Sequence, residues 1–520
     1  MGYGLRTDRF RYVEWLSQKT CETQFVELYD HATDSSEDRN VAEDPKHTGN
    51  IKKLSASLWN KVDKPQPSVF SEPKVRPNIL FLMGDDWSCP PAGLLRDKVA
   101  RTPTFDELAK NGAMFENAFV TAPSCTPSRF AVATGQWHWR LGEGANLGGS
   151  LAKNVPVYPD LLADAGYATG YTRKGAGPSQ HTYRGSDPFG KRFENFAAFL
   201  EHRQPRQPFC FWYGAGEPHR PYRSGTGTKR GYRLGAVQVP DFLPDNAVVR
   251  SDICDYYEAI ERFDRETARM LKQLEDAGEL ENTIIVVAGD NGMPFPRCKA
   301  TLYDSGTRVP LLVHWPRGTT GGRRVSDFVS LSDLAPTFLS AAGVNTPDSM
   351  TGQSLLAILT SHESGQVDSR RTSVLTGMER HVYAYPARAI RTADFLLIRN
   401  FDPQRWPTGE SKRPSPPIDF TDGSWPAFPG AFSYNIDPSP TKTQLLKQRD
   451  QADFQRHFRL ACGPHPEIEL YDLNKDPHQI HNVAGESAYA EQQKRLLKRL
   501  ETALRRSGDP RIAAQEVESP

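Results

Sequence analysis

The sequence predicts an α/β sandwich followed by a small α+β subdomain. Residues 78–83 form a continuous apolar run, which is typical of a strand buried on both faces of a parallel sheet. Helical and strand patterns alternate after this run, as in proteins whose helices cover both faces of a sheet. From about residue 370 the pattern changes to short strands and a Pro-rich loop, and we expect the subdomain there.

The first 64 residues are predicted to form a separate α+β piece. Residues 5–12 alternate like a strand, residues 26–30 look like a second strand, and residues 51–62 have the spacing of a helix. Residues 65–77 are rich in Pro and polar side chains, and we expect them to form a linker.

Residues 78–365 are predicted to form the main domain, with helices at 102–109 and 158–165 and strands at 78–83, 168–171, 209–213, 283–288 and 311–315. The subdomain is expected over residues 366–506. Its predicted elements are strands at 374–377, 389–392 and 395–400, a Pro-rich loop at 402–440 and a helix at 489–506. Residues 507–520 are expected to be a tail.

An internal repeat links the first 64 residues to the subdomain. Leu5-Arg6-Thr7 with Phe10 recurs as Ile390-Arg391-Thr392 with Phe395. Glu27-Leu28-Tyr29-Asp30, Asp34 and Asn40-Val41-Ala42 recur at identical spacing as Glu469-Leu470-Tyr471-Asp472, Asp476 and Asn482-Val483-Ala484. Each copy then runs into a helix, so we expect the two copies to share one fold. The first copy contains no nucleophile motif and no metal cluster, and we assign it no catalytic role.

The composition excludes several classes of protein. The 64 Lys and Arg residues nearly balance the 63 Asp and Glu residues, so no overall field favours nucleic acid. The seven Cys are scattered without paired spacing, which argues against a disulfide framework and a zinc site. No run is long enough to span a membrane, and the N-terminus as written has no apolar segment of a secretory signal.

Acidic and amide side chains follow two of the predicted strands. Asp85 and Asp86 come directly after residues 78–83, and Asp290 and Asn291 follow residues 283–288. Because the carboxyl ends of strands in an open α/β sheet meet at one crevice, these side chains can converge there. Three carboxylates and an amide oxygen suit a hard cation such as Ca²⁺ or Mg²⁺ better than zinc.

The stretch Cys125-Thr126-Pro127-Ser128-Arg129 is predicted to form a strand-to-helix turn. Pro fixes φ at the start of the helix, and Arg129 lies one turn after Cys125 on the same side. The thiol would then stand at a helix N-terminus beside a guanidinium, where negative charge is favoured. The alternative is a buried structural Cys beside a surface Arg.

This stretch resembles the C-x-P-S-R signature of the type I sulfatases. The resemblance implies an alkaline-phosphatase-like sandwich with a large central mixed sheet and a C-terminal antiparallel sheet. It also implies that Cys125 is oxidised to formylglycine by a formylglycine-generating or anaerobic sulfatase-maturating enzyme. The metal it implies is Ca²⁺ rather than Mg²⁺, held by Asp85, Asp86, Asp290, Asn291 and the oxidised side chain of Cys125.

The same resemblance implies a ring of cations around a sulfate group. Besides Arg129, the residues that match the family's catalytic positions are Lys174, His219 and Lys299. The family usually has a His two residues after the first Lys, where this chain has Ala176. His181 and His138 are the nearby histidines that could replace it.

The stretch 290–296 (DNGMPFP) and the block 385–395 resemble the N-sulfoglucosamine sulfohydrolase subfamily, with Lys299 in place of an Arg. The implied substrate is the N-sulfate of glucosamine in heparan-type saccharides, with Arg380, His381 and His181 as candidate substrate-binding residues. An O-sulfatase on glycosaminoglycan, aryl or other esters remains an alternative, and so does an inactive sugar-binding homologue. The first 64 residues resemble the C-terminal part of an iduronate-2-sulfatase-type protein, and this resemblance implies either a real fusion or a gene prediction that merged two reading frames. Family members are usually exported, so we expect a periplasmic or secreted protein.

Overall fold

The computed structural model describes residues 2–17, 22–62, 76–89, 97, 99–181, 184–403 and 435–517. The chain forms two compact units, Met1–Val75 and Arg76–Pro520. Each unit is described by itself. The predicted linker at 65–77 lies outside the described residues except for its last two positions.

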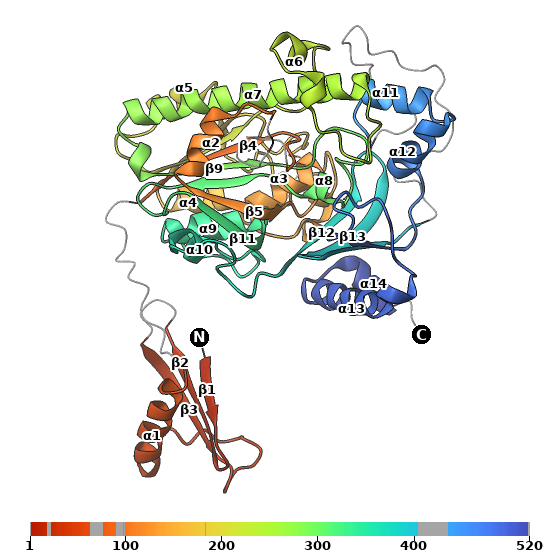
Figure 1. Ribbon diagram of the computed structural model, residues 1–520. Coiled ribbons are helices and arrows are strands. Elements are labelled where there is room, and N and C mark those ends of the chain that lie inside the picture. Colours follow the sequence, from red (N-terminus) through yellow and green to blue (C-terminus); the bar gives the residue numbers. More distant parts are fainter. Residues whose placement is uncertain are drawn as a thin grey trace. The chain divides into compact units, whose positions relative to one another are not determined.

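The N-terminal unit is a three-stranded antiparallel sheet with one helix (Figure 1). Its strands are β1 (Gly2–Arg6), β2 (Phe10–Leu16) and β3 (Thr23–Asp30), and its helix is α1 (Thr48–Trp59). The prediction of one strand at 5–12 is wrong, because the chain turns where the Thr7 hydroxyl accepts a hydrogen bond from the Phe10 amide at 2.9 Å. The strand-like alternation of side chains continues through this tight hairpin, so the sequence pattern did not reveal the turn.

The predicted repeat is confirmed in the fold of the subdomain. Strands β13 (Ala384–Thr392), β14 (Phe395–Asn400) and β15 (Ile468–Asp472) pair in the same order as β1, β2 and β3. Asn40 Oδ1 accepts the amides of Leu28 and Ala42 at 2.9 and 3.0 Å. Asn482 Oδ1 accepts the amides of Leu470 and Ala484 at 2.8 and 2.9 Å. The two copies therefore fold alike down to their side-chain hydrogen bonds.

The main sheet of the second unit has eight strands in the order β11-β5-β10-β9-β4-β8-β6-β7. It is mixed, because β10 runs antiparallel to both of its neighbours. Its strands are β4 (Asn78–Gly84), β5 (Ala113–Phe119), β6 (Ala168–Arg173), β7 (Lys191–Arg192), β8 (Phe209–Gly214), β9 (Thr283–Gly289), β10 (Leu311–His314) and β11 (Arg323–Ser330). The predicted strands at 78–83, 168–171, 209–213, 283–288 and 311–315 are confirmed.

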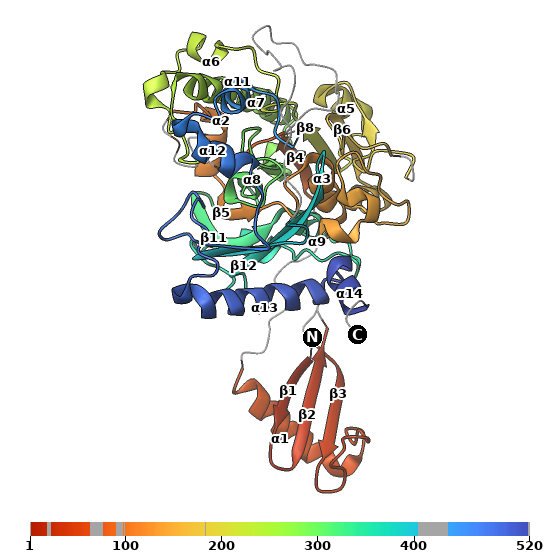
Figure 2. The same cartoon turned by 90° about the vertical axis from the view of Figure 1, so that its right-hand side faces the viewer.

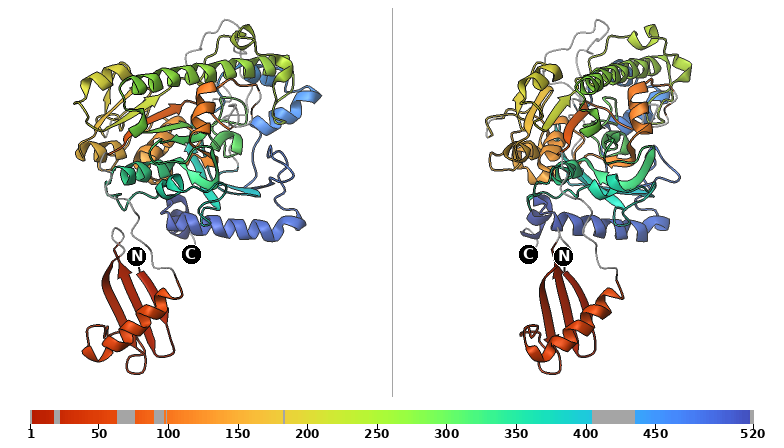
Figure 3. Two further views of the ribbon diagram at one scale, coloured as in Figure 1. Left: turned by 60° about the vertical axis from the view of Figure 1, so that its left-hand side comes forward. Right: turned by 90° about the vertical axis from the view of Figure 1, so that its left-hand side faces the viewer.

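Helices cover both faces of this sheet, as the alternating pattern predicts. On one face Ile79, Phe81 and Met83 pack with α3 (Cys125–Thr134), α4 (Tyr158–Asp164), α9 (Leu334–Ala341) and α10 (Leu356–Thr360). On the other face Leu80 and Leu82 pack with α2 (Pro103–Lys110), α5 (Phe196–His202) and the long α7 (Ala247–Asp276). The short helices α6 (Thr226–Lys229) and α8 (Asp304–Thr307) lie in connections. Figure 3 shows α7 along one side of the sandwich.

The C-terminal sheet has the order β12-β13-β14-β15, where β12 is Ser373–Arg380. Helix α13 (Ala490–Arg506) packs on one face through Leu496, Leu500 and Leu504 (Figure 2). The opposite face packs on Leu302 and Tyr303 of the main domain. The sheet thus lies between its own helix and the region that follows β9.

The end of the chain differs from the predicted tail. Helix α14 (Pro510–Val517) follows α13, and Asp509 before it is buried with its carboxylate on the Arg388 guanidinium. Most of the predicted loop at 402–440 lies outside the described residues. It is followed by α11 (Pro440–Lys447) and α12 (Ala452–Cys462). No helix in the described part of the chain combines the length and the apolar character that crossing a membrane requires.

Candidate active site

Two adjacent strands carry the acidic residues to one place. Strands β4 and β9 are parallel neighbours that pair up to Gly84 and Gly289, so Asp85 and Asp290 leave the sheet side by side. The Asp86 amide donates to Asp290 Oδ1 at 2.8 Å, and Asn291 Nδ2 donates to Asp86 Oδ1 at 2.7 Å. The structure therefore brings all four predicted metal ligands of the strand ends together.

Cys125 is the first residue of α3, and its side chain points at the acidic strand ends. Its Sγ lies 3.6 Å from Asp85 Oδ1 and 3.9 Å from Asp86 Oδ1. The helix begins two residues before Pro127, a small departure from the predicted start. Burial raises the pKa of the Cys125 thiol, while Lys174 and Lys299 lower it and Asp85 and Asp290 raise it.

Arg129 is fully buried one turn after Cys125. Its Nε donates to Asp290 Oδ2 at 2.8 Å, its Nη2 lies 3.6 Å from Asp85 Oδ1, and its Nη1 donates to the Gly175 carbonyl at 3.0 Å. Two carboxylates and a carbonyl therefore surround the guanidinium, and Asp290 and Asp85 keep it charged. The alternative of a surface Arg is excluded.

Two lysines pair with the same carboxylates. Lys174 Nζ lies 2.7 and 2.6 Å from the two oxygens of Asp85, and Lys299 Nζ lies 2.8 Å from Asp86 Oδ2. Burial alone would raise the pKa of Asp85, but Lys174 and the other nearby cations lower it well below its usual value. The Asp85 carboxylate is therefore ionised at neutral pH, whereas burial raises the pKa of Asp290 to about 6.

His219 stands on the loop that follows β8. Its Nε2 lies 3.7 Å from Asp86 Oδ2, and 28% of its side chain is exposed. The other ring nitrogen, Nδ1, contacts the Arg220 carbonyl, which fixes the orientation of the ring. Its side chain is thus more exposed than those of Arg129, Lys174 and Lys299.

The three candidate substrate-binding residues have different surroundings. His381 is buried, its Nδ1 lies 2.8 Å from Ser124 Oγ, and burial lowers the pKa of its ring to about 3, so it is neutral. Arg380 is exposed at the tip between β12 and β13. His181 Nε2 lies 3.4 Å from Asp187, whose carboxylate also accepts the Ala176 amide.

The two histidines that could replace the missing family His also have different surroundings. His138 is buried beside Trp139, with the charges of Arg388 and Glu379 nearby, under the C-terminal sheet. His181 reaches the backbone at Ala176 through Asp187. Ala176 itself is fully buried in the main core.

Two groups near the site were not predicted from the sequence. Asp437 Oδ2 lies 3.2 Å from Lys299 Nζ. Asp252 of α7 binds the Arg220 guanidinium at 2.8 and 2.9 Å and thereby holds the loop that carries His219. Neither residue belongs to a short motif, so spacing alone gave no signal for them.

The donors present suit a hard divalent cation. Ligand atoms of Asp85, Asp86 and Cys125 all lie within 4.8 Å of one another. Asn291 Oδ1 is buried and has no hydrogen-bond partner among the described residues. An unpartnered amide oxygen beside three carboxylates is the donor set that Ca²⁺ or Mg²⁺ prefers. The residues therefore fit the predicted metal site.

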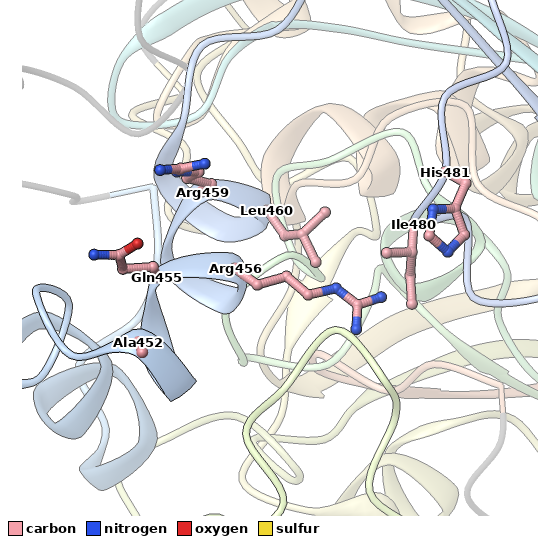
Figure 4. Close-up of a pocket in the computed structure, with 7 residues that line it drawn as sticks. All are labelled: Ala452, Gln455, Arg456, Arg459, Leu460, Ile480 and His481. Atoms are coloured by element: carbon pink, nitrogen blue, oxygen red, sulfur yellow. The ribbon is translucent and has the colours of Figure 1, made fainter.

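A separate surface hollow lies between α12 and residues 480–481. Figure 4 shows Arg456 pointing toward Ile480 and His481, while Arg459 points the other way. The hollow shares no residue with the acidic cluster, so the two sites are distinct.

Two protein-family models match the chain. The Sulfatase model matches residues 77–344, which is more than half of the sequence. The model for N-sulphoglucosamine sulphohydrolase, C-terminal, matches residues 297–409. The first range contains all the residues assigned above to the acidic cluster and the cations.

Curated relatives cover most of the chain. An ulvan-active sulfatase of Formosa agariphila is 28% identical over 84% of this chain and 76% of its own length. The N-sulphoglucosamine sulphohydrolase of Homo sapiens is 28% identical over 85% of this chain and 93% of its own length.

Solved structures share the fold. The structure of BT4656 in complex with its substrate D-glucosamine-2-N,6-O-disulfate has a TM-score of 0.60 at 21% identity and covers 84% of this chain and 99% of its own. The phosphonate monoester hydrolase of Agrobacterium radiobacter has a TM-score of 0.57 at 14% identity and covers 83% and 96%. The predicted alkaline-phosphatase-like fold is confirmed. The chain therefore belongs to the sulfatase family, which implies a formylglycine and a divalent metal, and it is a sulfuric ester hydrolase.

Proposed function

We propose that this sulfatase removes the N-sulfate of glucosamine in heparan- or heparin-type saccharides. The observation that carries the proposal is the match of the N-sulphoglucosamine sulphohydrolase C-terminal model to residues 297–409. That range contains Lys299, which binds Asp86, and His381, which contacts Ser124 next to Cys125. The human relative of the same name, aligned over 93% of its length, supports it.

In this proposal Ca²⁺ is held by Asp85, Asp86, Asp290, Asn291 and the formylglycine formed from Cys125. When present, the cation and the oxidised side chain supply charge neutralisation and an oxygen nucleophile for sulfur. Arg129 keeps residue 125 and Asp290 in fixed positions. With the carboxylates turned toward the cation, Lys174 and Lys299 are available to bind the sulfate oxygens. His219 donates the proton that the leaving atom needs.

A second candidate is an O-sulfatase. The ulvan-active sulfatase of Formosa agariphila favours this function. Its sequence is 28% identical to this chain, the same identity as that of the human N-sulphoglucosamine sulphohydrolase. Lys299 also stands where the sulfohydrolase subfamily has an Arg, so the planar fork of that residue is absent here.

Sulfate release from defined saccharides decides between these functions. The full chain, produced together with a formylglycine-generating enzyme, is given N-sulfoglucosamine and its 2-O- and 6-O-sulfated counterparts. We expect the highest kcat/KM on N-sulfoglucosamine. Activity on the O-sulfated sugars with none on the sulfamate would overturn the proposed substrate.

Removing the metal tests the cofactor. We expect a chelator to abolish sulfate release, and Ca²⁺ to restore it more fully than Mg²⁺. Full activity in the chelator would contradict the proposed site.

Peptide mass mapping around Cys125 tests the remaining alternative, an inactive sugar-binding homologue motivated by Ala176. We expect the mass of formylglycine at position 125 in the co-produced protein. An unmodified thiol would favour the inactive protein.

A periplasmic or secreted location is also proposed, from family resemblance.

A further inference from the structure

Asp437 is a fourth carboxylate beside the acidic cluster, and no role given above uses it. Its Oδ2 lies 3.2 Å from Lys299 Nζ, the ammonium that also contacts Asp86 at 2.8 Å. Only 12% of the Asp437 side chain is exposed, so it faces the enclosed site more than bulk water. Other titratable groups close enough to act on it are His219, Arg220, Tyr222, His381 and Lys442.

The segment that carries Asp437 is firmly attached on both sides. Asn435 Oδ1 accepts the amides of Val382 and Tyr383 at 2.9 and 2.8 Å, which ties the segment to the β12–β13 tip. Lys442 Nζ donates to the Ile436 carbonyl at 2.7 Å, and the Ser439 hydroxyl caps α11. The carboxylate is therefore held in place by packed elements, as a recognition group requires.

The same segment shares an anchor with the proton donor. Thr441 Oγ1 donates to Asp252 Oδ2 at 2.6 Å, and the two oxygens of Asp252 also bind Arg220, the residue after His219. Figure 1 shows α11 beside one end of α7. His219 and Asp437 are thus positioned by one buried carboxylate, which fixes them relative to each other.

The chemistry of Asp437 limits what it can bind. A carboxylate in this site repels the sulfate group, whose oxygens match the cations Lys174 and Lys299. Asp437 Oδ2 is buried and pairs with Lys299 Nζ at 3.2 Å, which uses one of the several acceptor positions of the carboxylate. It can therefore accept a hydrogen bond from a part of the substrate that has a donor. The bridging nitrogen of a sulfamate carries such a hydrogen, whereas the bridging oxygen of a sulfate ester has none.

We propose that Asp437 is a specificity residue that accepts the N–H of the sulfamate and binds the amino group of the product. The assignment rests on the proposed function. In the reaction an S–O bond would form to the hydroxyl oxygen at residue 125, whose proton would pass to Asp290, while the S–N bond breaks, its electron pair stays on nitrogen and nitrogen takes a proton from His219. Sulfate would then leave residue 125 and restore the starting side chain. The amine takes a second proton from water, and the resulting ammonium is favoured beside a carboxylate.

The first test is kinetic and uses Asp437→Asn, which keeps the shape and removes the charge. We expect kcat/KM on N-sulfoglucosamine to fall by roughly tenfold to a hundredfold, as for a lost charge-assisted hydrogen bond. Glu467→Gln, an exposed carboxylate of the same subdomain, is the matched control and should change nothing. An unchanged rate on N-sulfoglucosamine in Asp437→Asn would overturn the assignment.

The second test measures binding to the full chain with Ca²⁺, by calorimetry near neutral pH. The probes are glucosamine, glucose and inorganic sulfate. We expect the original protein to prefer glucosamine over glucose, and Asp437→Asn to lose this preference while it binds sulfate as well as before or more tightly. An equal loss of all three ligands would mean that Asp437 only balances Lys299, and would overturn the proposal.

The proposed reaction and the proposed role of Asp437 can be disproved independently of each other. If the original protein prefers glucosamine through Asp437 but releases no sulfate from N-sulfoglucosamine, the proposed reaction is wrong and the role of Asp437 in binding an amino sugar stands. If the protein cleaves N-sulfoglucosamine but binds glucosamine no better than glucose, the assignment of Asp437 is wrong and the proposed reaction stands.

Discussion

Arg129 is the buried cation on which the arrangement of the acidic cluster depends. It joins Asp290 at the end of β9 to Asp85 at the end of β4, and it also binds the backbone of the loop that carries Lys174. Because three chain segments meet at one guanidinium, its planar shape matters as much as its charge.

Replacing Arg129 with Lys keeps the charge and removes the fork. We expect sulfate release to fall about a hundredfold or more, because the carboxylates beside residue 125 lose their fixed positions. We also expect a lower free energy of unfolding in urea. Arg173→Lys, at the exposed end of β6, is the control and should retain activity. Activity like that of the original protein in Arg129→Lys would show that the fork is not needed.

The sequence predicted the residues of the site that follow strands or belong to a motif. Asp85, Asp290 and Cys125 could be placed because buried strands and a Pro-containing turn fix where their side chains go. Asp437 could not, since a long Pro-rich stretch separates it from the other site residues in sequence and one Asp there carries no pattern. The protonation of Cys125 was also beyond the sequence, because it depends on how completely the thiol is buried.

At the scale of elements, α7 connects the main domain to the segments around the site. Its Asp252 is buried, binds Arg220 with both oxygens and accepts the Thr441 hydroxyl. This carboxylate therefore holds two separate loops against one helix.

Asp252→Ala would leave the buried Arg220 without its partner. Breaking such a pair typically costs about 3–5 kcal/mol, so we expect a clear drop in the urea midpoint. We also expect a lower kcat, because His219 is no longer fixed. Asp245→Ala, which removes a more exposed partner of Arg250 just before α7, is the control. Unchanged stability would contradict the role given to Asp252.

The buried Glu469 of β15 makes the subdomain sensitive to acid. Burial alone would raise the pKa of Glu469, but hydrogen bonds and charge from His465, Tyr471 and Asn400 lower it to about 2. Its ionised form therefore stabilises the fold at neutral pH. That contribution is lost as pH falls from the ordinary carboxyl range toward about 2.

We expect the free energy of unfolding of the original protein to decrease steeply below about pH 4.5, by a few kcal/mol from this group. Glu469→Gln should be less stable at neutral pH and should show a shallower dependence in the acidic range. Urea unfolding at a series of pH values measures both. Parallel curves for the two proteins would exclude Glu469 as the cause.

The helices and strands with a strong apolar pattern were predicted from the sequence, whereas those without such a pattern were not. The apolar run of β4 and the repeated strands of the subdomain were predicted. Strand β5 has Glu116 and Asn117 within it, and β11 at the sheet edge begins with two Arg residues, so neither forms an apolar run. In α7 the buried Asp255 and Asp264 interrupt the apolar stripe that would identify a helix.

At the scale of the molecule, the catalytic groups all belong to one of the two compact units. The acidic cluster, its cations and Asp437 lie within Arg76–Pro520. The N-terminal unit has its own small core of Tyr12, Leu28, Leu54 and Leu58.

A chain that starts at Arg76 should therefore keep its activity. We expect kcat/KM for sulfate release to stay within about twofold of the full chain, since each unit has its own core. The thermal midpoint of the larger unit should also be unchanged. A loss greater than about tenfold would show that the first unit takes part in the reaction.

The architecture of the molecule was largely predictable, because alternating elements and buried strands identify an α/β sandwich. The exact repeat also revealed that one small fold occurs twice. What the sequence could not show is that residues after 435 return to the site, since that depends on tertiary contacts such as Asn435 with the 382–383 backbone.

The two copies of the Asn-centred turn also affect how the chain folds. Strand β3 pairs with β2 in the register that β15 has with β14, with Asp30 opposite Phe10 and Asp472 opposite Phe395. During renaturation Thr23–Asp30 can thus compete for the place of Ile468–Asp472 beside β14, a misassembly characteristic of repeated segments. A chain trapped in this exchange would have a complete backbone ladder with Glu27 in the place of Glu469, so recovery from denaturant should be slower and less complete than for a chain with a single copy.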